Sequence, residues 1–142
     1  MAGMISTLAG VIIWTDQLER MAAFYRDVLE LPVHSVRPHF VAFELAHGAR
    51  LSVGTHSEVH GPAKESVRVT VNLGVTDIHA TYRTLVARGV TFVRPPEREH
   101  WGGWVASFRD PDGNLVQLLQ PPETAGQADT EPDPHPGLSP AR

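Results

Sequence analysis

The chain has 142 residues, a formal net charge of −4 and a hydrophobic fraction of 42%, which suits a globular protein with a packed core. This acidic balance gives no basic surface for nucleic acid, and no apolar run is long enough to cross a bilayer. The absence of cysteine excludes disulfides, thiolate metal sites and cysteine nucleophiles. The N-terminus has no charged region before its apolar stretch, so we expect a cytoplasmic location.

An internal repeat organises residues 5–120. The segment GVIIWTDQLERMAAFYRDVLELPV resembles NLGVTDIHATYRTLVARGVTF, so that Thr15-Asp16 falls on Thr76-Asp77. In each copy a β-rich run ends at Thr-Asp and an amphipathic helix follows. Because Asp side chains accept hydrogen bonds from the free N–H groups of a helix start, we expect Asp16 and Asp77 to cap these helices.

Each predicted helix is followed by strands and a turn. Helical spacing predicts one apolar face in each helix, and Gly89 is placed to end the second helix. A hairpin is predicted around His47-Gly48, and a tight turn is predicted at Asp110–Asn114. The apolar helix positions are Leu18, Met21, Phe24, Tyr25 and Val28 in the first copy, and Ile78, Tyr82, Leu85 and Val86 in the second.

These elements predict an α+β fold of two βαβββ units, with a curved mixed sheet around a cleft and the helices outside. We expect one domain over residues 1–120, with the first unit at about 5–56 and the second at about 66–120. Residues 121–142 are rich in Pro, Gly and acidic residues, and are expected to form a flexible tail.

Two segments resemble a known family. Asp16–Val33 is similar to the first-helix signature of the vicinal oxygen chelate superfamily, the glyoxalase, bleomycin-resistance and dioxygenase proteins. The signature usually ends in Leu-Gly, and here Leu31-Pro32 stands nearby instead. Trp101–Gln120 is similar to the C-terminal signature. The resemblance covers residues 5–120 and implies the fold, but neither signature identifies a reaction.

The resemblance also implies where metal ligands would stand. Metal-dependent members carry His and Glu on the first and last strands of the units; the matching residues here are Ala9, Ser52, Thr70 and Gln117. Neutral side chains alone bind divalent transition metals weakly. A registration error of one residue would bring in Gly10, Val71, Val116 or Leu118, which are no better. We therefore expect neither a metal nor another cofactor. A site built from His39 or His100 with Glu44 or Glu99 is the alternative.

Strand alternation predicts which residues line the cleft. We expect a pocket of aliphatic and neutral polar groups, with two indoles near it for stacking on a planar ligand. Glu44 would act as a general base if it pointed inward. The residues predicted to bind a ligand are Val11, Ile13, Phe43, Arg50, Ser52, Thr70, Asn72, Trp101, Trp104 and Gln117.

Three functions are consistent with these features. The first is a metal-free binding protein that sequesters an antibiotic or another natural product, and the resemblance implies a homodimer. The second is an enzyme, such as a lyase, an isomerase or a dioxygenase-like protein, with an absent or unfamiliar metal site. The third is an accessory domain that associates through its tail. The sequence leaves open whether the cleft lies within one chain or across a swapped dimer.

Overall fold

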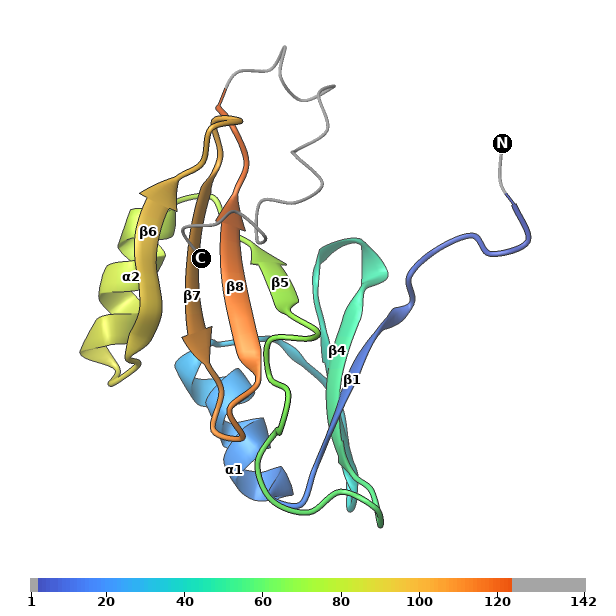
Figure 1. The fold of residues 1–142 in the computed structure, drawn as a ribbon. Coiled ribbons are helices and arrows are strands. Elements are labelled where there is room, and N and C mark those ends of the chain that lie inside the picture. Colours follow the sequence, from blue (N-terminus) through green and yellow to red (C-terminus); the bar gives the residue numbers. More distant parts are fainter. Residues whose placement is uncertain (1–2, 124–142) are drawn as a thin grey trace. The chain divides into compact units, whose positions relative to one another are not determined.

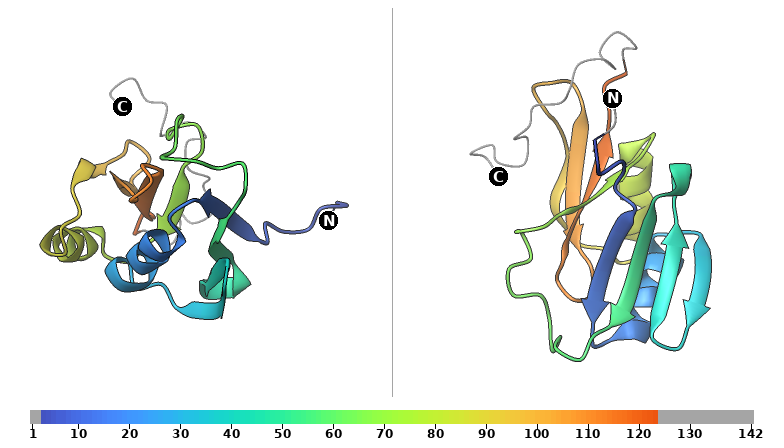
Figure 2. Two further views of the ribbon diagram at one scale, coloured as in Figure 1. Left: turned by 90° about the horizontal axis from the view of Figure 1, so that it is seen from below. Right: turned by 90° about the vertical axis from the view of Figure 1, so that its right-hand side faces the viewer.

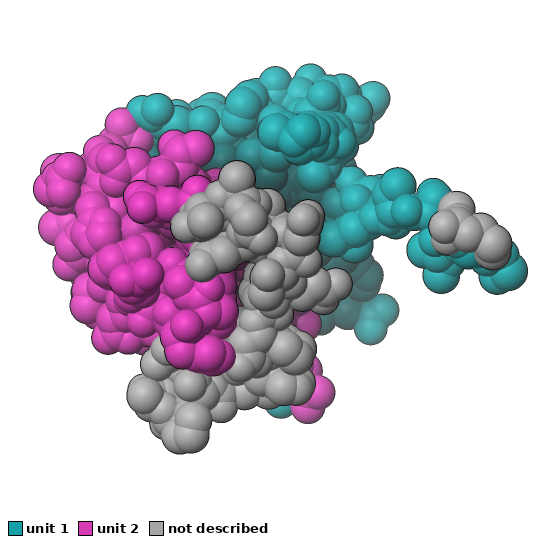
Figure 3. All heavy atoms as spheres, turned by 90° about the horizontal axis from the view of Figure 1, so that it is seen from above, with its two compact units in different colours: residues 1–65, 110–114 teal, residues 66–109, 115–142 magenta. Residues whose placement is uncertain are grey.

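A computed structural model describes residues 3–123, and most of the predicted tail, residues 124–142, lies outside them. The chain divides into two compact units (Figure 3). Unit 1 consists of residues 1–65 together with the short segment 110–114, and unit 2 consists of residues 66–109 and 115–142. The turn at 110–114 therefore belongs to unit 1, although the strands on either side of it belong to unit 2.

Unit 1 is a four-stranded mixed sheet with one helix (Figure 1). The sheet order is β1-β4-β3-β2, with β1 parallel to β4 and the other pairs antiparallel. Figure 2 shows this sheet face on, with α1 behind it. The elements are β1 (Gly10–Thr15), α1 (Leu18–Ala23), the π-helical turn η1 (Phe24–Val28), β2 (Val33–Arg37), β3 (Phe40–Glu44), the 3-10 turn η2 (Ala46–Gly48) and β4 (Arg50–Thr55).

Unit 2 repeats this topology with the sheet order β5-β8-β7-β6. Its first strand is parallel to its last strand, and the remaining pairs are antiparallel. The elements are β5 (Val71–Gly74), α2 (Ile78–Ala87), β6 (Phe92–Arg98), β7 (Trp104–Arg109) and β8 (Leu115–Gln120). The predicted α+β class and the two βαβββ units are thus confirmed. None of the described helices has the length and apolar character that spanning a bilayer requires.

The core of unit 1 lies on one face of its sheet. Leu51, Val53 and Phe43 are almost fully buried there, and the Phe43 ring lies 6.4 Å from that of Tyr25 in the helical segment. Met21 and Tyr25, spaced for one helical face, have no exposed surface. Burial of such side chains contributes roughly 1.5–3 kcal/mol each. This face therefore holds α1 and η1 against the sheet, and α1 does not cover the opposite face.

The two helices begin and end differently. Asp77 caps α2 as predicted, because its Oδ1 accepts a hydrogen bond from the Ala80 N–H at 3.0 Å. The same prediction is wrong for Asp16, whose Oδ2 accepts instead from the Gly61 N–H. Gly89 follows α2 with φ 92°, as a C-terminal glycine does, whereas Glu30 takes a left-handed conformation after η1 with φ 58°.

Candidate functional site

Cross-strand pairing defines the face of the unit 1 sheet that α1 does not cover. Paired residues project to the same side, so the sheet carries three transverse rows there. The upper row is Gly10, Arg50 and Glu44, the middle row is Ile12, Ser52, Ala42 and Ser35, and the lower row is Trp14, Gly54, Phe40 and Arg37.

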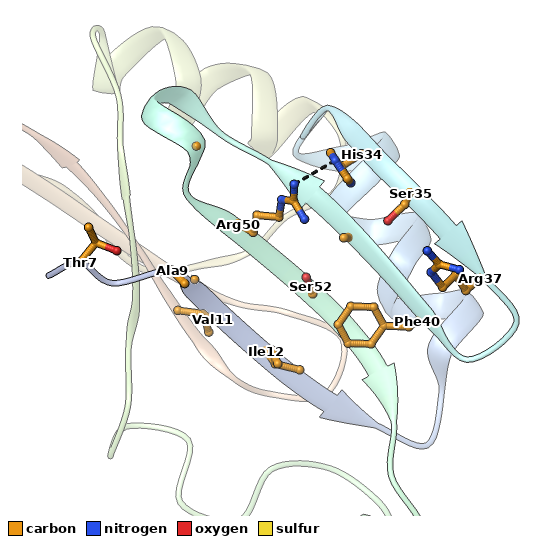
Figure 4. A pocket seen from close by; sticks show the side chains of 13 residues that line it. Thr7, Ala9, Val11, Ile12, His34, Ser35, Arg37, Phe40, Arg50 and Ser52 are labelled. Carbon is orange, nitrogen blue, oxygen red and sulfur yellow. Dashed lines mark hydrogen bonds between the residues drawn. The ribbon is translucent and has the colours of Figure 1, made fainter. Parts of the chain in front are cut away.

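These rows enclose a groove of about 720 Å³ (Figure 4). Its floor is formed by the two central strands, where Ser52 and Ala42 are small and nearly buried. Its sides are larger side chains, with Ile12 on β1 at one edge and Arg50 and Phe40 in the rows above and below, so the face is hollow at its centre. The lining residues are Thr7, Ala9, Gly10, Val11, Ile12, His34, Ser35, Arg37, Phe40, Ala42, Gly48, Arg50 and Ser52.

The upper end of the groove is polar. Arg50 donates from Nε to Glu44 Oε1 at 3.2 Å, and its Nη2 lies 2.9 Å from His34 Nε2. All three side chains are 40–45% exposed, so this ion pair is screened by solvent. Glu44 is therefore held by a guanidinium at the surface. It does not occupy the desolvated position that would favour a general base.

The lower end of the groove is aromatic. The rings of Trp14 and Phe40 lie 6.2 Å apart, and Trp14 also meets His56 edge-on at 5.3 Å. Gly54 makes this arrangement possible, because a Cβ there would stand 2.7 Å from Phe40 Cδ1 and 2.9 Å from Trp14 Cζ3. An aromatic edge of this kind offers dispersion contacts to an apolar ligand.

Of the residues predicted to bind a ligand in unit 1, Arg50 and Ser52 line the groove together. The predicted orientation of Ile13 and Phe43 is wrong. Ile13 pairs with Val53, and Phe43 pairs with Leu51, so both side chains belong to the buried face. Val11 pairs with Leu51 on that same side, although it still contributes to the groove at the edge strand.

The residues predicted from the sequence do not include Ile12, Phe40 and Ala42, which line the groove. They lie on the face of the sheet to which the sequence assigns Val11, Ile13 and Phe43. Alternation could not reveal this, because GVIIW is apolar at four consecutive positions and FVAF carries an aromatic ring at both ends. The available signal was the strand partner: both faces follow once Ile12 is paired with Ser52 and Phe40 with Gly54.

Two of the ligand-binding residues predicted in unit 2, Asn72 and Gln117, lie side by side on its own sheet. Asn72 pairs with Gln117, and the Gln117 Nε2 donates to Asn72 Oδ1 at 3.1 Å, while Val71 and Val116 are buried on the opposite face. Thr70 precedes β5 and is exposed. Their role in binding a ligand stays a prediction.

The two predicted indoles have partners inside unit 2. The Trp101 ring covers Gly103, where any Cβ would collide with it, and its buried Nε1 has no hydrogen-bond partner in the structure. Trp104 meets His79 of α2 edge-on, with the ring centroids 4.7 Å apart. Neither indole is among the residues that line the groove of unit 1.

The register corrects one of the expected metal-ligand positions. Thr70 precedes Asn72 by two residues, and the counterpart of Asn72 in unit 1 is Ile12, because each pairs with a matching residue of the last strand. The equivalent of Thr70 is therefore Gly10, not Ala9. A Cβ at residue 10 would collide with the Arg50 carbonyl. A ligating side chain does not fit there without a shift of the backbone.

The residues at these positions therefore do not fit a divalent metal. Gly10 and Ser52 in unit 1, and Thr70 and Gln117 in unit 2, supply neither imidazole nor carboxylate. Within residues 3–123, no three His, Asp or Glu side chains gather in a way that could hold a metal ion.

A buried hydrogen-bond network anchors unit 1 behind the groove. The Tyr25 hydroxyl donates to Asp110 Oδ2 at 2.7 Å, and Asp110 Oδ1 accepts from the backbone N–H groups of Asp112 and Asn114. Burial raises the pKa of Asp110, although the hydrogen bonds from Tyr25 and Asn114 lower it. Burial and the nearby Asp110 carboxylate also raise the pKa of Tyr25, which keeps its hydroxyl as the donor. The network positions the helical segment and is structural.

Comparisons with known proteins agree with this architecture. A model of the Glyoxalase/Bleomycin resistance protein/Dioxygenase superfamily matches residues 7–118. The protein YraH of Bacillus subtilis (strain 168) is 28% identical over 116 residues, which cover 74% of this chain and 91% of YraH.

Two solved structures show the same fold at low identity. TnmS3, an antibiotic binding protein from Streptomyces sp. CB03234, is 22% identical with a TM-score of 0.70, over 84% of this chain and 98% of TnmS3. A lactoylglutathione lyase from Agrobacterium tumefaciens is 19% identical with a TM-score of 0.67, over 83% of this chain and 96% of the lyase. One of these proteins binds an antibiotic and the other is a lyase, so the shared fold leaves both functions open.

Proposed function

Because this chain belongs to the Glyoxalase/Bleomycin resistance protein/Dioxygenase superfamily, we propose that it is a metal-free protein that binds a medium-sized, partly apolar small molecule. An antibiotic or another natural product is the kind of ligand we expect. The observation that carries the proposal is the groove of unit 1, whose floor is neutral where metal-dependent relatives carry ligands.

The size and lining of the groove support this proposal. A volume of about 720 Å³ lies within the range of small-molecule sites, which hold roughly 300–1,000 Å³. Ile12, which is 50% exposed, and Phe40 offer apolar surface to a ligand, while Ser35 and Ser52 offer hydroxyl groups. TnmS3 shows that this fold can serve an antibiotic binding protein. The homodimeric state and the cytoplasmic location expected from the sequence stay predictions.

The proposal is tested by thermal unfolding of the full chain with a panel of aromatic and glycosylated antibiotics. A ligand present at 100 times its Kd stabilises the folded state by roughly 2.7 kcal/mol, which raises the Tm by several degrees. The variant Ala42→Leu fills the floor of the groove and should abolish this shift. Ala87→Leu adds the same bulk at an exposed position of α2 and should leave the shift intact.

Two results would contradict the proposal. The first is that no compound raises the Tm at a concentration about a hundred times a micromolar Kd, or that Ala42→Leu and Ala87→Leu change the ligand-induced shift in Tm equally. The second is a stoichiometric amount of zinc, nickel, iron or manganese, found by elemental analysis after purification without chelators. That finding would favour an enzyme with an unfamiliar ligand set over a metal-free binding protein.

A further inference from the structure

The groove of unit 1 has an uneven charge, and the following inference rests on the proposed function of that groove. Three of its lining residues, His34, Arg37 and Arg50, are basic, and none of the lining residues is acidic. The chain as a whole carries a formal charge of −4, so this local excess of basic groups runs against the average composition. A surface of that kind attracts anions.

The two arginines differ in what they contact. Arg50 already forms an ion pair with Glu44 and lies beside His34. Arg37 forms no ion pair with any described residue. On its other side it borders a hollow between α1 and β2 that Glu19 also lines, and it does not pair with that carboxylate either. Arg37 is therefore the cation of the groove whose charge no described carboxylate offsets.

The position of Arg37 suits a ligand that combines an anion with an apolar body. Arg37 pairs directly with Phe40 across β2 and β3, so their side chains start about 5 Å apart. Ser35 precedes Arg37 by two residues, and its hydroxyl faces the same groove (Figure 4). Pro38 restricts the backbone of Arg37 to the extended region, which fixes the direction of its Cα–Cβ bond at the edge strand.

We propose that the ligand of this groove is an amphiphilic organic anion. Its apolar body rests on Phe40 and Ile12 over the floor formed by Ala42 and Ser52. Its carboxylate, sulfonate or phosphate group binds the Arg37 guanidinium, whose planar pair of N–H donors matches the two oxygens of such a group. The hydroxyl of Ser35 adds a further donor. Arg37 is thus the residue that selects anions over neutral molecules of the same shape.

Two fluorescent probes separate charge from shape. Anilinonaphthalene sulfonate and phenylnaphthylamine share one aromatic body, and only the first carries a sulfonate. We expect the wild-type chain to bind the sulfonate more tightly than the neutral probe. Because a charge-assisted hydrogen bond is lost, Arg37→Gln should weaken binding of the sulfonate by about tenfold or more. It should change binding of phenylnaphthylamine by less than about twofold.

Matched variants locate the effect. Arg83→Gln removes one positive charge from an exposed position of α2 and should leave both probes unaffected. Ala42→Leu should weaken both probes, since it fills the groove itself. Backbone amide shifts in β3 and β4 on addition of each probe provide an independent check that binding occurs there.

The outcomes distinguish the inference from the function on which it rests. If both probes bind in the groove and Arg37→Gln changes them equally, or changes neither, the anion inference is overturned while the binding function stands. If neither probe binds, or if Ala42→Leu has no effect on binding of either probe, the anion inference is overturned. The binding function is overturned as well only if no compound of the antibiotic panel raises the Tm.

Discussion

The equivalent faces of the two sheets differ, although the sheets share one topology. In unit 1 the middle row across the sheet is small at its centre, and the groove lies over it. In unit 2 the corresponding row is polar, and its side chains bond to one another and to nearby carboxylates. The row of unit 1 is Ile12, Ser52, Ala42 and Ser35, and that of unit 2 is Asn72, Gln117, Ser107 and Arg94.

This difference shows that the backbone sets the rows and the side chains decide their use. In unit 1, small residues at the centre of the middle row, flanked by larger ones such as Ile12, Arg50 and Phe40, create a hollow. Long polar side chains that satisfy one another, such as Gln117 and Asn72, give unit 2 a different surface on the same frame. Duplication of one unit thus gives two sheet faces that can specialise independently.

The largest effect on stability is expected from replacing Arg94 on the face of unit 2, and replacing Arg50 on the face of unit 1 serves as its comparison. The Nη2 of Arg94 lies 2.6 Å from the Oε2 of Glu99, and the two side chains are only 13% and 3% exposed, respectively. Arg94→Leu leaves the Glu99 carboxylate buried without this guanidinium and should lower the free energy of unfolding by about 3–5 kcal/mol. Arg50→Leu breaks an exposed pair and should cost less than about 1 kcal/mol. Urea unfolding at neutral pH measures both, and equal losses would contradict the contrast drawn between the faces.

An effect of intermediate size is expected from the network that anchors the helix of unit 1. Tyr25→Phe removes a buried hydrogen bond to a carboxylate and should cost about 2 kcal/mol. Tyr82→Phe makes the same chemical change in α2 of unit 2, where Tyr82 packs edge-on against Phe92, and should cost much less. Urea unfolding measures the loss of unfolding free energy in both variants. A larger loss for Tyr25→Phe than for Tyr82→Phe would show that the hydrogen bond to the turn at 110–114 stabilises unit 1, and equal losses would contradict this.

The cost of Tyr25→Phe should also depend on pH. Burial raises the pKa of Asp110 above its usual 3.8, so this carboxyl favours the fold below that pH, and its contribution is lost as pH rises through the raised value. The Tyr25 hydrogen bond favours the ionised form and offsets part of that loss. The difference between wild type and Tyr25→Phe should therefore narrow as pH falls through the raised pKa. A difference that stays constant between neutral and mildly acidic pH would exclude this role.

Much of the fold could be predicted from the sequence because its signals are local. The Thr-Asp junctions, the apolar spacing of the helices and the turn at Asp110–Asn114 each lie within a few residues. The hydrogen bond between Tyr25 and Asp110 could not be predicted, since it joins positions 85 residues apart. The capping role expected of Asp16 is wrong for a related reason, because its carboxylate accepts a hydrogen bond from the N–H of Gly61, which is distant in sequence.

The site was predicted less well than the fold, because it depends on strand register. A shift of one residue moves every side chain to the other face. In unit 2 the alternation of small polar and apolar residues around Asn72 set the register correctly. In unit 1 the strand is apolar at Val11, Ile12 and Ile13 alike, and only its pairing with β4 shows which of them faces the groove.

The smallest effect is expected where the helical segments of the two units end. Unit 2 uses Gly89 at φ 92°, but unit 1 places Glu30 at φ 58°, where a Cβ is strained. Glu30→Gly removes that strain but adds freedom to the unfolded chain, so we expect it to be about 0.5 kcal/mol more stable than the matched variant Glu30→Ala. Glu30→Ala removes the same carboxylate and keeps the Cβ, so it reports what the side chain itself contributes. The glycine variant should therefore have the higher Tm of the two, and an equal or lower Tm would show that the left-handed position carries no strain for unit 1 to relieve.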